Sequence, residues 1–488
     1  MRRLSALAAV ATLAGCGASS PMPHASPRAA SSSMHWLAGT SGPAPSVGAE
    51  NAHPGTSAWR EADRDTRGSK IDAYVSAQDL RPGGSETVFV RARAASSVRI
   101  RLFRVGWYGG AGARLMGESG ALRTRAQPPC VHVSATGETA CSWRPTLTFA
   151  VPESLPSGIY LVNVVAGSRQ RDALFVLEAA RAAPLLAHIS TATYQAYNDW
   201  GGDSLYPGGK RVGVTGTSQG VVVSYDRPYA TTTGAGELFA RDIAMVRYLE
   251  RAGFPLSYTT STGGAAALAG ARVLLDVGHS EYWSSGERAA WAAALARGAS
   301  LAFFSSDTLA WKVAYRGHEI VGYKEHASLD RSRRSGAFAD LGAGLTGSAF
   351  TGCITPRRPA VGRAEYRYFD WSPAPGPLLR GTGLTPRSRV AMITGYELDA
   401  RTPHSPAGVR ILGVGSASCQ RGSGIAQSTL YAAPSGGLVF ATGTLGWGFG
   451  VAPLADPGSD VQQAPDPGLV RLTTNMVGQM LARRATAR

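Results

Sequence analysis

The chain has 488 residues, of which 44% are hydrophobic and 17% charged, a composition that suits a folded core and excludes an intrinsically disordered protein. Sixty glycines and 29 prolines without a repeat exclude a collagen-like chain and favour a loop-rich, β-containing protein over a helical bundle. The formal net charge is +16, but no block of five or six basic residues occurs. We therefore expect no nucleic-acid partner, because binding one needs a basic stripe or a known module.

The first residues have the pattern of an export signal. Arg2 and Arg3 precede an apolar stretch over residues 4–13, which is too short to span a bilayer, and Cys16 follows three residues later. Leu13-Ala14-Gly15-Cys16 resembles a lipobox, so residues 1–16 are predicted to be a lipoprotein signal with Cys16 lipidated. An ordinary signal peptide is the alternative. Both predict an exported protein, periplasmic or at the cell surface, and the first predicts contact with the membrane through the lipid anchor only.

The other four cysteines are an even number, which permits two disulfides in an oxidising compartment. Of the three connectivities we prefer Cys130 with Cys141 and Cys353 with Cys419, because the segment inside the first pair contains a glycine and can turn back as a hairpin. Zinc binding is not expected, since no C-x-x-C motif occurs and no histidine stands at ligand spacing.

A flexible spacer and a β-rich region are predicted in the first 180 residues. Residues 17–65 are rich in Ser, Ala, Pro and Gly without periodicity, which predicts the spacer. Residues 66–180 are predicted to form an all-β sandwich, because apolar and polar residues alternate within short runs separated by Gly or Pro. The expected strands cover residues 87–91, 98–104, 146–151, 159–165 and 173–177.

Residues 181–488 predict an α/β domain with long loops, so the fold class is α/β plus all-β. Buried-strand patterns alternate with helical ones, which favours a doubly wound parallel sheet with helices on both faces and ligands at the carboxyl ends of its strands. The expected strands are 185–189, 272–277, 300–304 and 437–441. The expected helices are 237–252, 285–297 ending at Gly298, and a C-terminal helix with an apolar stripe of Leu469, Leu472, Met476 and Met480.

Polar residues follow three of these strands. His279 and Glu281 come after one strand, Asp307 after another, and the segment 193–200 after a third. In an extended segment residues two apart point the same way, so His279 and Glu281 are expected to project together, as a metal ligand beside an acid–base group. The alternative stays open that the aromatics pack under loops and His279 only hydrogen-bonds a neighbour.

An ordered set of motifs between roughly residues 70 and 485 resembles the large (β) subunit of N,N-dimethylformamidase and its relatives. The motifs include Phe103-Arg-Val-Gly-Trp-Tyr-Gly-Gly110, Ser157-Gly-Ile-Tyr160, Tyr194-Gln-Ala-Tyr-Asn-Asp-Trp-Gly-Gly202, Ser224-Tyr-Asp-Arg-Pro-Tyr229, Gly278-His-Ser-Glu-Tyr-Trp283 and Gly395-Tyr-Glu397. That enzyme hydrolyses dimethylformamide to formate and dimethylamine with a mononuclear iron held by two tyrosinates and a glutamate. The resemblance implies an amidohydrolase acting on a small linear amide, an immunoglobulin-like sandwich, and an α/β part like the class I glutamine amidotransferases.

The resemblance also implies the metal ligands. Glu281 matches the glutamate, Tyr197 is expected to be the first tyrosine with Tyr194 as its local rival, and Tyr160 is expected to be the second. Such ligands suit ferric iron and would place it between the two domains. For the tyrosines the alternative is a buried side chain whose hydroxyl bonds a carbonyl.

The same resemblance implies three catalytic residues. His279 is expected to orient water or substrate, and Glu397 to act as general base. Asp307 stands where relatives tend to carry asparagine and adds a negative charge, so substrate orientation can differ. The dimethylformamidase large subunit is longer and works with a small partner subunit; a partner subunit or a homo-oligomer is compatible with this chain but not implied.

The sequence also has features of three other functions. Gly216-Thr-Ser-Gln-Gly220 matches the nucleophile-elbow string around Ser218, but a strand pattern follows it, whereas the elbow needs a strand before it and a helix after. A cysteine nucleophile is not expected, because no cysteine follows a predicted strand. The remaining alternative is a non-catalytic, lipid-anchored module of the cell envelope that binds a sugar or peptide through Trp200, Trp283, Trp311 and Trp447.

Overall fold

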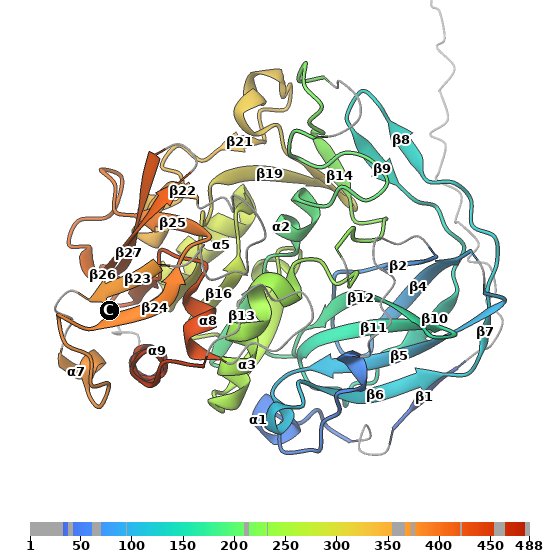
Figure 1. Ribbon diagram of the computed structural model, residues 1–488, viewed down its shortest axis with the longest axis horizontal. Helices are drawn as coiled ribbons and strands as arrows, with labels where there is room; N and C mark the ends of the chain where they lie inside the picture. Colours follow the sequence, from blue (N-terminus) through green and yellow to red (C-terminus); the bar gives the residue numbers. More distant parts are fainter. Residues whose placement is uncertain are drawn as a thin grey trace, which may run out of the picture. The chain divides into compact units, whose positions relative to one another are not determined.

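The computed structural model describes residues 33–37, 42–60, 70–93, 95–208, 214–231, 233–353, 367–371, 376–419, 422–452 and 464–483. The protein is mixed α/β, with more residues in strands than in helices (Figure 1). Cys16 and the predicted signal over residues 1–16 lie outside the described residues. None of the helices in the described ranges could span a bilayer.

The β-rich region contains two facing sheets, coloured blue to cyan-green in Figure 1. One sheet has the order β1-β6-β5-β11-β12-β3, with β7 also paired to β5, and the other has the order β10-β4-β2. Their apolar side chains alternate along the strands and form a shared core. The strands are β1 (Met34–Trp36), β2 (Ile71–Val75), β3 (Asp79–Leu80), β4 (Ser85–Ala92), β5 (Ser97–Val105), β6 (Ala113–Ser119), β7 (Leu122–Arg123), β10 (Leu147–Ala150), β11 (Gly158–Ala166) and β12 (Arg169–Leu177).

All five strands predicted in this region are present. The alternation expected over residues 98–102 is clear in β5, where Val98, Ile100 and Leu102 are buried and Arg99 is exposed. The immunoglobulin-like character of the region, and its boundary at residue 180, stay predictions.

A disulfide joins Cys130 and Cys141 across a hairpin of β8 (Val131–Val133) and β9 (Glu138–Ala140), as predicted from the glycine between them. Cys353 and Cys419 end the strands β22 (Ala349–Cys353) and β26 (Arg410–Cys419). Their side chains lie outside the part of the chain that the structure describes, so their pairing stays a prediction.

The prediction of a flexible spacer over residues 17–65 is wrong where the structure describes that segment. Strand β1 pairs with β6, and a helix α1 (Val47–Glu50) and a short 3₁₀ turn (Ala58–Arg60) follow. Trp59 is 1% exposed and stacks on Phe239 with ring centroids 5.2 Å apart. The low-complexity composition concealed a few apolar residues that pack on the domain.

A nine-stranded sheet forms the middle of the α/β region, in the order β15-β13-β16-β18-β28-β27-β26-β23-β24. The first five strands are parallel and the remaining pairs are antiparallel. The strands are β13 (Leu185–Ile189), β15 (Leu256–Thr260), β16 (Val273–His279), β18 (Ser300–Ser306), β23 (Arg367–Trp371), β24 (Arg389–Thr394), β26, β27 (Gly422–Ala432) and β28 (Leu438–Ala441).

The expectation of a purely parallel sheet therefore holds for only one half of it. Segments 185–189, 272–277, 300–304 and 437–441 were recognised from their buried-strand patterns. The antiparallel half comes from residues 367–432, where the sequence predicts mainly long loops. Strands β26 and β27 form a hairpin there, whose many small residues, Gly413, Gly415, Ser416 and Gly424 among them, carry little apolar signal.

Alternate residues of the parallel strands face opposite helical layers. Ala187, Leu275 and Phe304 pack with α3, α8 and α9, whereas Leu186, Leu274 and Phe303 pack with α5 and α6. The helices on both faces were predicted from the alternation of patterns. The helices are α2 (Thr191–Ala196), α3 (Ile243–Arg251) preceded by a π-helical turn (Leu238–Asp242), α4 (Gly264–Ala267), α5 (Ser285–Ala296), α6 (Ala343–Thr346), α7 (Gly376–Leu379), α8 (Trp447–Val451) and α9 (Pro467–Ala482).

Smaller elements cover the carboxyl ends of the parallel strands. A five-stranded sheet has the order β14-β20-β19-β17, with β21 paired to β19, and β22 pairs with β25. The bounds are β14 (Val222–Ser224), β17 (Tyr282–Ser284), β19 (Trp311–Arg316), β20 (Glu319–Val321), β21 (Gly336–Ala337), β25 (Glu397–Ala400) and a 3₁₀ segment (Lys324–Leu329).

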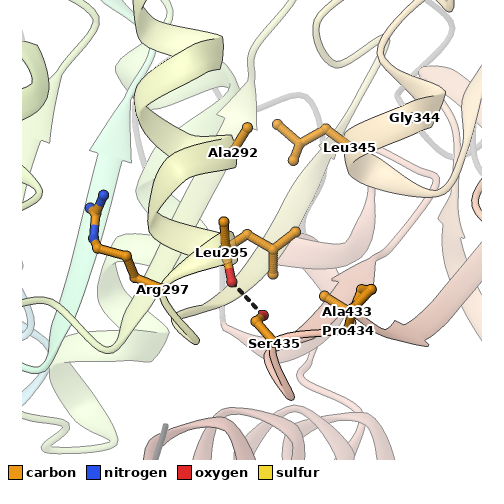
Figure 2. Close-up of a pocket in the computed structure, with 9 residues that line it drawn as sticks. Ala292, Leu295, Arg297, Gly344, Leu345, Ala433, Pro434 and Ser435 are labelled. Atoms are coloured by element: carbon orange, nitrogen blue, oxygen red, sulfur yellow. Dashed lines mark hydrogen bonds between the residues drawn. The ribbon is translucent and has the colours of Figure 1, made fainter. Parts of the chain in front are cut away.

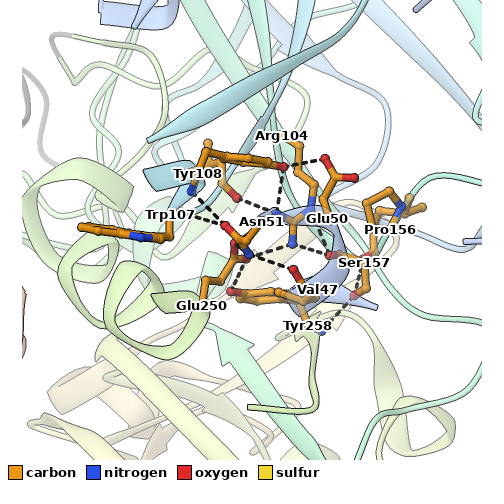
Figure 3. Close-up of polar contacts among 12 residues, drawn as sticks. Val47, Glu50, Asn51, Arg104, Trp107, Tyr108, Pro156, Ser157, Glu250 and Tyr258 are labelled. Atoms are coloured by element: carbon orange, nitrogen blue, oxygen red, sulfur yellow. Dashed lines mark hydrogen bonds and ion pairs between the residues drawn. The ribbon is translucent and has the colours of Figure 1, made fainter. Parts of the chain in front are cut away.

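A buried ion pair joins the β-rich region to the α/β region (Figure 3). Arg104 of β5 donates to both carboxylate oxygens of Glu250 in α3, at 2.8 and 3.1 Å, and to the carbonyl of Ser157. Tyr258 and Asn51 also donate to Glu250. The side chains of Arg104 and Glu250 are fully buried. All their nitrogen and oxygen atoms have hydrogen-bond partners. We call Arg104, Glu250, Tyr108, Tyr258 and Asn51 the Arg104 cluster.

Candidate functional site

Two tyrosine hydroxyls and one carboxylate meet just beyond the carboxyl end of β16. The Tyr206 hydroxyl lies 2.7 Å from each carboxylate oxygen of Glu281 and 2.7 Å from the Tyr197 hydroxyl. The Tyr197 hydroxyl donates to Glu281 Oε2 at 2.8 Å. Glu281 is 2% exposed, whereas the two tyrosines are partly exposed and form the solvent side of this group.

The helix α2 fixes two of these residues relative to each other. The helix α2 begins directly after strand β13, and Tyr197 is the residue that caps its C-terminal end. Within α2, the Thr193 hydroxyl accepts hydrogen bonds from the backbone N–H groups of Glu281 (3.0 Å) and Tyr282 (3.3 Å). Thr193 and Tyr197 of the segment 193–200 therefore contact the segment 278–283, as the sequence predicts for segments that follow neighbouring strands.

A glycine turns the end of β16 toward this site. Gly278 has φ of 72°, and a Cβ there would lie 1.8 Å from Asp242 Oδ1. Only glycine fits both the backbone conformation and this close approach. The next residue, His279, places Nδ1 2.7 Å from Glu237 and Nε2 3.1 Å from Glu397 Oε2. Its Nε2 lies 3.6 Å from Glu281 Oε2, so His279 and Glu281 do project together.

His279 is a charged group held between carboxylates. Burial opposes its charged form, but Glu397 and Glu237 outweigh burial and raise the pKa of His279 well above its ordinary value. Burial likewise opposes ionisation of Glu237, and the charge of His279 overcomes it and lowers the pKa of Glu237. The contact between His279 Nε2 and Glu397 Oε2 is an ion pair without an aligned hydrogen bond.

Further acidic groups surround Glu281. Burial raises the pKa of Glu281, and Glu397 adds to the effect, while Lys324 and His279 oppose it. Burial, Glu281 and Glu397 together raise the pKa of Asp307. The backbone N–H of Asp307 donates to Asp399 at 2.7 Å, and burial raises the pKa of Asp399 to about 7.

Lys324 is the cation nearest the phenols. Its ammonium nitrogen lies 3.3 Å from the ring centroid of Tyr206, a cation–π contact, and 5.0 Å from that of Trp311. Burial lowers the pKa of Lys324, and the charge of Glu281 opposes that shift. We call Tyr197, Tyr206, Glu237, His279, Glu281, Asp307, Lys324 and Glu397 the Glu281 cluster.

Tyr160 does not join this cluster, which corrects the expectation that it is the second tyrosine ligand. It belongs to β11, its ring stacks on Phe175 in the core between the two β-sheets, and its hydroxyl donates to the carbonyl of Pro156 at 2.6 Å. It is thus the buried, carbonyl-bonded tyrosine of the alternative interpretation. The site also does not lie between two domains, since its residues all come from the α/β region.

The site contains one of the two rival tyrosines and three residues that the sequence did not predict. Tyr194 donates to Asp242 and is not near Glu281, so Tyr197 is the tyrosine of this segment that reaches the site. The prediction missed Tyr206, Lys324 and Glu237. Tyr206 lies nine residues beyond Tyr197 in a loop, and Lys324 is one of only four lysines in an arginine-rich chain. The rarity of lysine was the only sequence signal for Lys324. Tyr206 and Glu237 had none, because neither follows a predicted strand.

Two alternative functions lose support from the structure. Trp283 and Trp447 are fully buried and cannot contact a sugar or peptide, while Trp200 and Trp311 are partly exposed. Ser218 lies in a turn, where its hydroxyl accepts a hydrogen bond from the backbone of Gly208. Strand β14 follows Ser218 instead of a helix, so the segment is not a nucleophile elbow.

Three cavities are lined by residues outside the Glu281 cluster. A cavity of about 520 Å³ lies between α5, α6 and the turn after β27, with Leu295, Leu345 and Pro434 in its walls (Figure 2). Arg297 is the charged residue in the wall of this cavity, and because arginine stays protonated the wall offers no acid–base group. A second cavity of about 470 Å³ contains His188 and Glu287, and a third of about 650 Å³ contains Arg91, Arg93 and Trp200.

Within the described ranges, no group of three or more His, Cys, Asp or Glu side chains is placed to hold a metal ion. A metal at the Glu281 cluster would therefore have to use phenolic oxygens as ligands. The Tyr197 and Tyr206 hydroxyls and the Glu281 carboxylate provide such a set, with oxygens 2.7–2.8 Å apart. Ligands bound about 2 Å from an ion at right angles to one another are separated by about 2.8 Å.

The sheet and the site define a class of mixed α/β protein with a buried tyrosine–carboxylate cluster at the carboxyl ends of parallel strands. Within that class, the chain belongs to the family described as N,N-dimethylformamidase beta subunit-like, C-terminal, whose model matches residues 99–461. The match confirms the resemblance seen in the sequence motifs. None of the curated proteins compared with the sequence matches it.

Proposed function

We propose that the protein is a metal-dependent hydrolase of the C–N bond of a small linear amide or formamide. Iron is the proposed metal, held by Tyr197, Tyr206 and Glu281. The observation that carries the proposal is the approach of these three oxygens within 2.7–2.8 Å, in a chain of the dimethylformamidase β-subunit-like family.

The donor set supports a hard, highly charged cation. Phenolate and carboxylate are hard anionic oxygen ligands, and ferric iron prefers such ligands over soft ones. Desolvation raises the pKa of Tyr197 and of Tyr206, and the charge of Glu281 adds to both shifts. A bound cation reverses these directions, because groups that ligate a metal lose their protons.

The surrounding side chains supply proton transfer and orientation. A bound iron ion would act as a Lewis acid on an amide carbonyl and make water more acidic. Glu397 is proposed as the general base, because its Oε2 is buried, faces His279 Nε2 and has no aligned hydrogen bond. His279, charged and fixed by Glu237, orients water or substrate. Asp307, whose pKa is raised in the metal-free protein by burial and by Glu281 and Glu397, is proposed to orient the substrate.

The cellular setting belongs to the same proposal. We propose an exported lipoprotein anchored through Cys16, and the Cys130–Cys141 disulfide supports an oxidising compartment. The family description names an enzyme's β subunit, which supports a partner subunit or an oligomer. The immunoglobulin-like and amidotransferase-like folds are proposed for the two regions because they contain facing β-sheets and a partly parallel α/β sheet.

The test is metal-dependent amide hydrolysis by the full chain. Purified protein is reconstituted with ferric iron and incubated with short formamides and N-acylated amines, and the released amine is quantified. We expect release with iron, none with Glu281→Gln, and wild-type release with Tyr160→Phe, whose hydroxyl lies in the other region. Iron-loaded protein that hydrolyses no member of the panel would contradict the proposed reaction.

A further inference from the structure

A second cavity, with both polar and apolar walls, lies at the same edge of the sheet as the Glu281 cluster and is lined by residues at the ends of β13 and β15. Its volume is about 470 Å³, within the range of small-molecule sites. Thr260 at the end of β15 and the next two residues, Ser261 and Thr262, form one wall with His188 of β13 and Glu287 of α5. Ala265, Leu268, Ala290 and Trp291 form an apolar wall.

His188 is oriented within this cavity by a carboxylate. Its Nδ1 lies 2.7 Å from Asp276 Oδ1, and both side chains are almost fully buried. The hydroxyls of Ser280 and Ser305 also donate to Asp276, at 2.8 and 2.9 Å. Asp276 is therefore held as an acceptor, which keeps the Nδ1 proton of His188 in place and directs Nε2 toward the cavity.

Ser261 is the hydroxyl that faces His188 Nε2. The Ser261 Oγ lies 3.4 Å from Nε2 in hydrogen-bonding geometry. The backbone N–H of Ala192 donates to the same oxygen at 3.4 Å. When His188 Nε2 carries no proton, the Ser261 hydroxyl, which accepts from the Ala192 N–H, can donate its own proton to Nε2. Nucleophile–base distances are often longer in a free enzyme than in its substrate complex.

We propose that Ser261, His188 and Asp276 form a second, metal-independent acyl-transfer site that hydrolyses a small carboxylic ester. Ser261 is the nucleophile, His188 the general base and Asp276 the residue that orients it. The apolar wall takes the acyl group. An ester is the substrate class because an alkoxide leaves more readily than the amide anion that cleavage of an unprotonated C–N bond would expel.

The reaction is balanced with water as the only co-substrate. Ser261 Oγ forms a bond to the acyl carbon while its proton passes to His188 Nε2. The ester C–O bond breaks, and the proton on Nε2 passes to the departing alkoxide. Water then attacks the acyl-serine with His188 as base, which releases the carboxylic acid and restores the serine.

Glu287 regulates this site through the charge of His188. Its Oε1 lies 3.0 Å from His188 Nε2 but has no aligned hydrogen bond. Burial lowers the pKa of His188, but Asp276 and Glu287 outweigh it and raise that pKa to about 9. Other titratable groups near the cavity include Tyr225 and Tyr315, whose pKa values burial raises so that both stay neutral in this range. Asp79 and Glu178 accept hydrogen bonds from the wall residues Thr262 and Thr259, and burial raises the pKa of both carboxyls. The base is thus mostly protonated at neutral pH and becomes active in alkali.

The first experiment maps the nucleophile by chemistry. Full-chain protein is treated with an alkyl fluorophosphonate in the presence of a chelator, so that the proposed metal site contributes nothing, and the modified residue is located by mass spectrometry. We expect modification of Ser261, at a rate that rises about tenfold per pH unit and levels off above about pH 9. Ser261→Ala abolishes it, and Ser218→Ala, which alters the partly exposed serine of the elbow-like string, leaves it unchanged.

The second experiment separates a catalytic from a structural histidine. Glu287→Gln removes a carboxylate beside His188 but keeps a side chain suited to the capping box that Glu287 forms with Ser284. The variant is expected to shift the labelling profile to lower pH and to label at least threefold faster at pH 7.5 than the wild type. Hydrolysis of p-nitrophenyl acetate should change in parallel.

Folded wild-type protein that is not modified at Ser261 at about pH 10 would overturn the proposal. An unchanged pH profile in Glu287→Gln would also overturn it, because His188 would then not be the base. Loss of amide hydrolysis on iron removal bears only on the Glu281 cluster, so the two proposals fail separately.

Discussion

The Arg104 cluster and the Glu281 cluster are both largely buried, and both combine tyrosines with carboxylate and cationic side chains: one of each charge in the first, four carboxylates and two cations in the second. In the first, Arg104 bonds both oxygens of Glu250, and Tyr258 and Asn51 complete the set. In the second, Glu237, Glu281, Asp307 and Glu397 share the charges of His279 and Lys324, and burial raises the pKa of Glu281 and of Asp307. Charge is matched in one cluster and left acidic in the other.

This difference indicates different roles. A charged pair whose hydrogen bonds are all satisfied fixes β5 against α3 and contributes to a single arrangement of the two regions. A buried group of carboxylates with raised pKa values costs stability, and such groups gather where chemistry or ligand binding requires them. The same residue types therefore have a structural role in the Arg104 cluster and a functional role in the Glu281 cluster. Substitutions in the two clusters should distinguish these roles.

The largest effect is expected from breaking the Arg104 cluster. Arg104→Met leaves Glu250 buried without its cation, which should cost about 3–5 kcal/mol in the free energy of unfolding. Arg104→Met combined with Glu250→Met should recover part of the loss. Urea unfolding measures both. The matched control is Arg316→Met at the exposed Arg316–Glu319 pair, for which about 0–1 kcal/mol is expected; an equal loss there would remove the distinction.

A pH series tests the stabilising effect of a cation held by two carboxylates. The pKa of His188 is about 9 in the folded protein against an ordinary 6.5, so charged His188 stabilises the fold fully below pH 6.5. This contribution, up to about 3 kcal/mol, is lost as the pH rises through about 9. Thermal unfolding should show the decline in the wild type and a smaller one in His188→Gln. Parallel curves would show that His188 is not the titrating group.

The same substitution should have opposite signs in the two clusters. Glu281→Gln removes one of several crowded carboxylates and should stabilise the metal-free protein by about 1 kcal/mol. Glu250→Gln weakens the matched pair and should destabilise it by about 2 kcal/mol. Chemical denaturation of the two variants in chelator measures the difference. If both variants lose stability equally, the acidic cluster is a structural feature.

The smallest effect concerns two phenols. Tyr160→Phe removes the donor to the Pro156 carbonyl and should cost about 1 kcal/mol, with iron binding unchanged. Tyr206→Phe should cost less in the metal-free protein, because Tyr197 still donates to Glu281. Stability and bound iron are measured on both variants. Iron loss from Tyr160→Phe would restore the original ligand assignment.

The sequence predicted elements well where one periodicity covered a whole element. Strands β5 and β16 have alternating or continuous apolar patterns, and α9 has an apolar stripe, so local sequence was sufficient. Strands β26 and β27 are rich in glycine and serine and are defined by pairing with each other. Trp59 packs on α3 from within a low-complexity segment, a contact that no local pattern reveals.

The site was predicted as far as strand ends could indicate it. His279 ends β16, Glu281 lies two residues beyond it, and Asp307 follows β18, so topology alone brought them to one edge of the sheet. Tyr206 and Lys324 reach the site from long loops, whose paths depend on tertiary contacts. Tyr160 was wrongly predicted to be a metal ligand. The sequence of a motif does not distinguish a tyrosine that binds a metal from one whose hydroxyl donates to a backbone carbonyl, as that of Tyr160 does.

The most direct test of the central claim is the visible absorption of the full chain after addition of ferric iron. If Tyr197, Tyr206 and Glu281 bind one ion, the wild type and Tyr160→Phe should both show a tyrosinate-to-iron charge-transfer band with about one iron per chain. Tyr197→Phe and Tyr206→Phe should weaken and shift that band, and the double variant should lose it. A colourless wild type, or a band that persists in the double variant, would contradict the account.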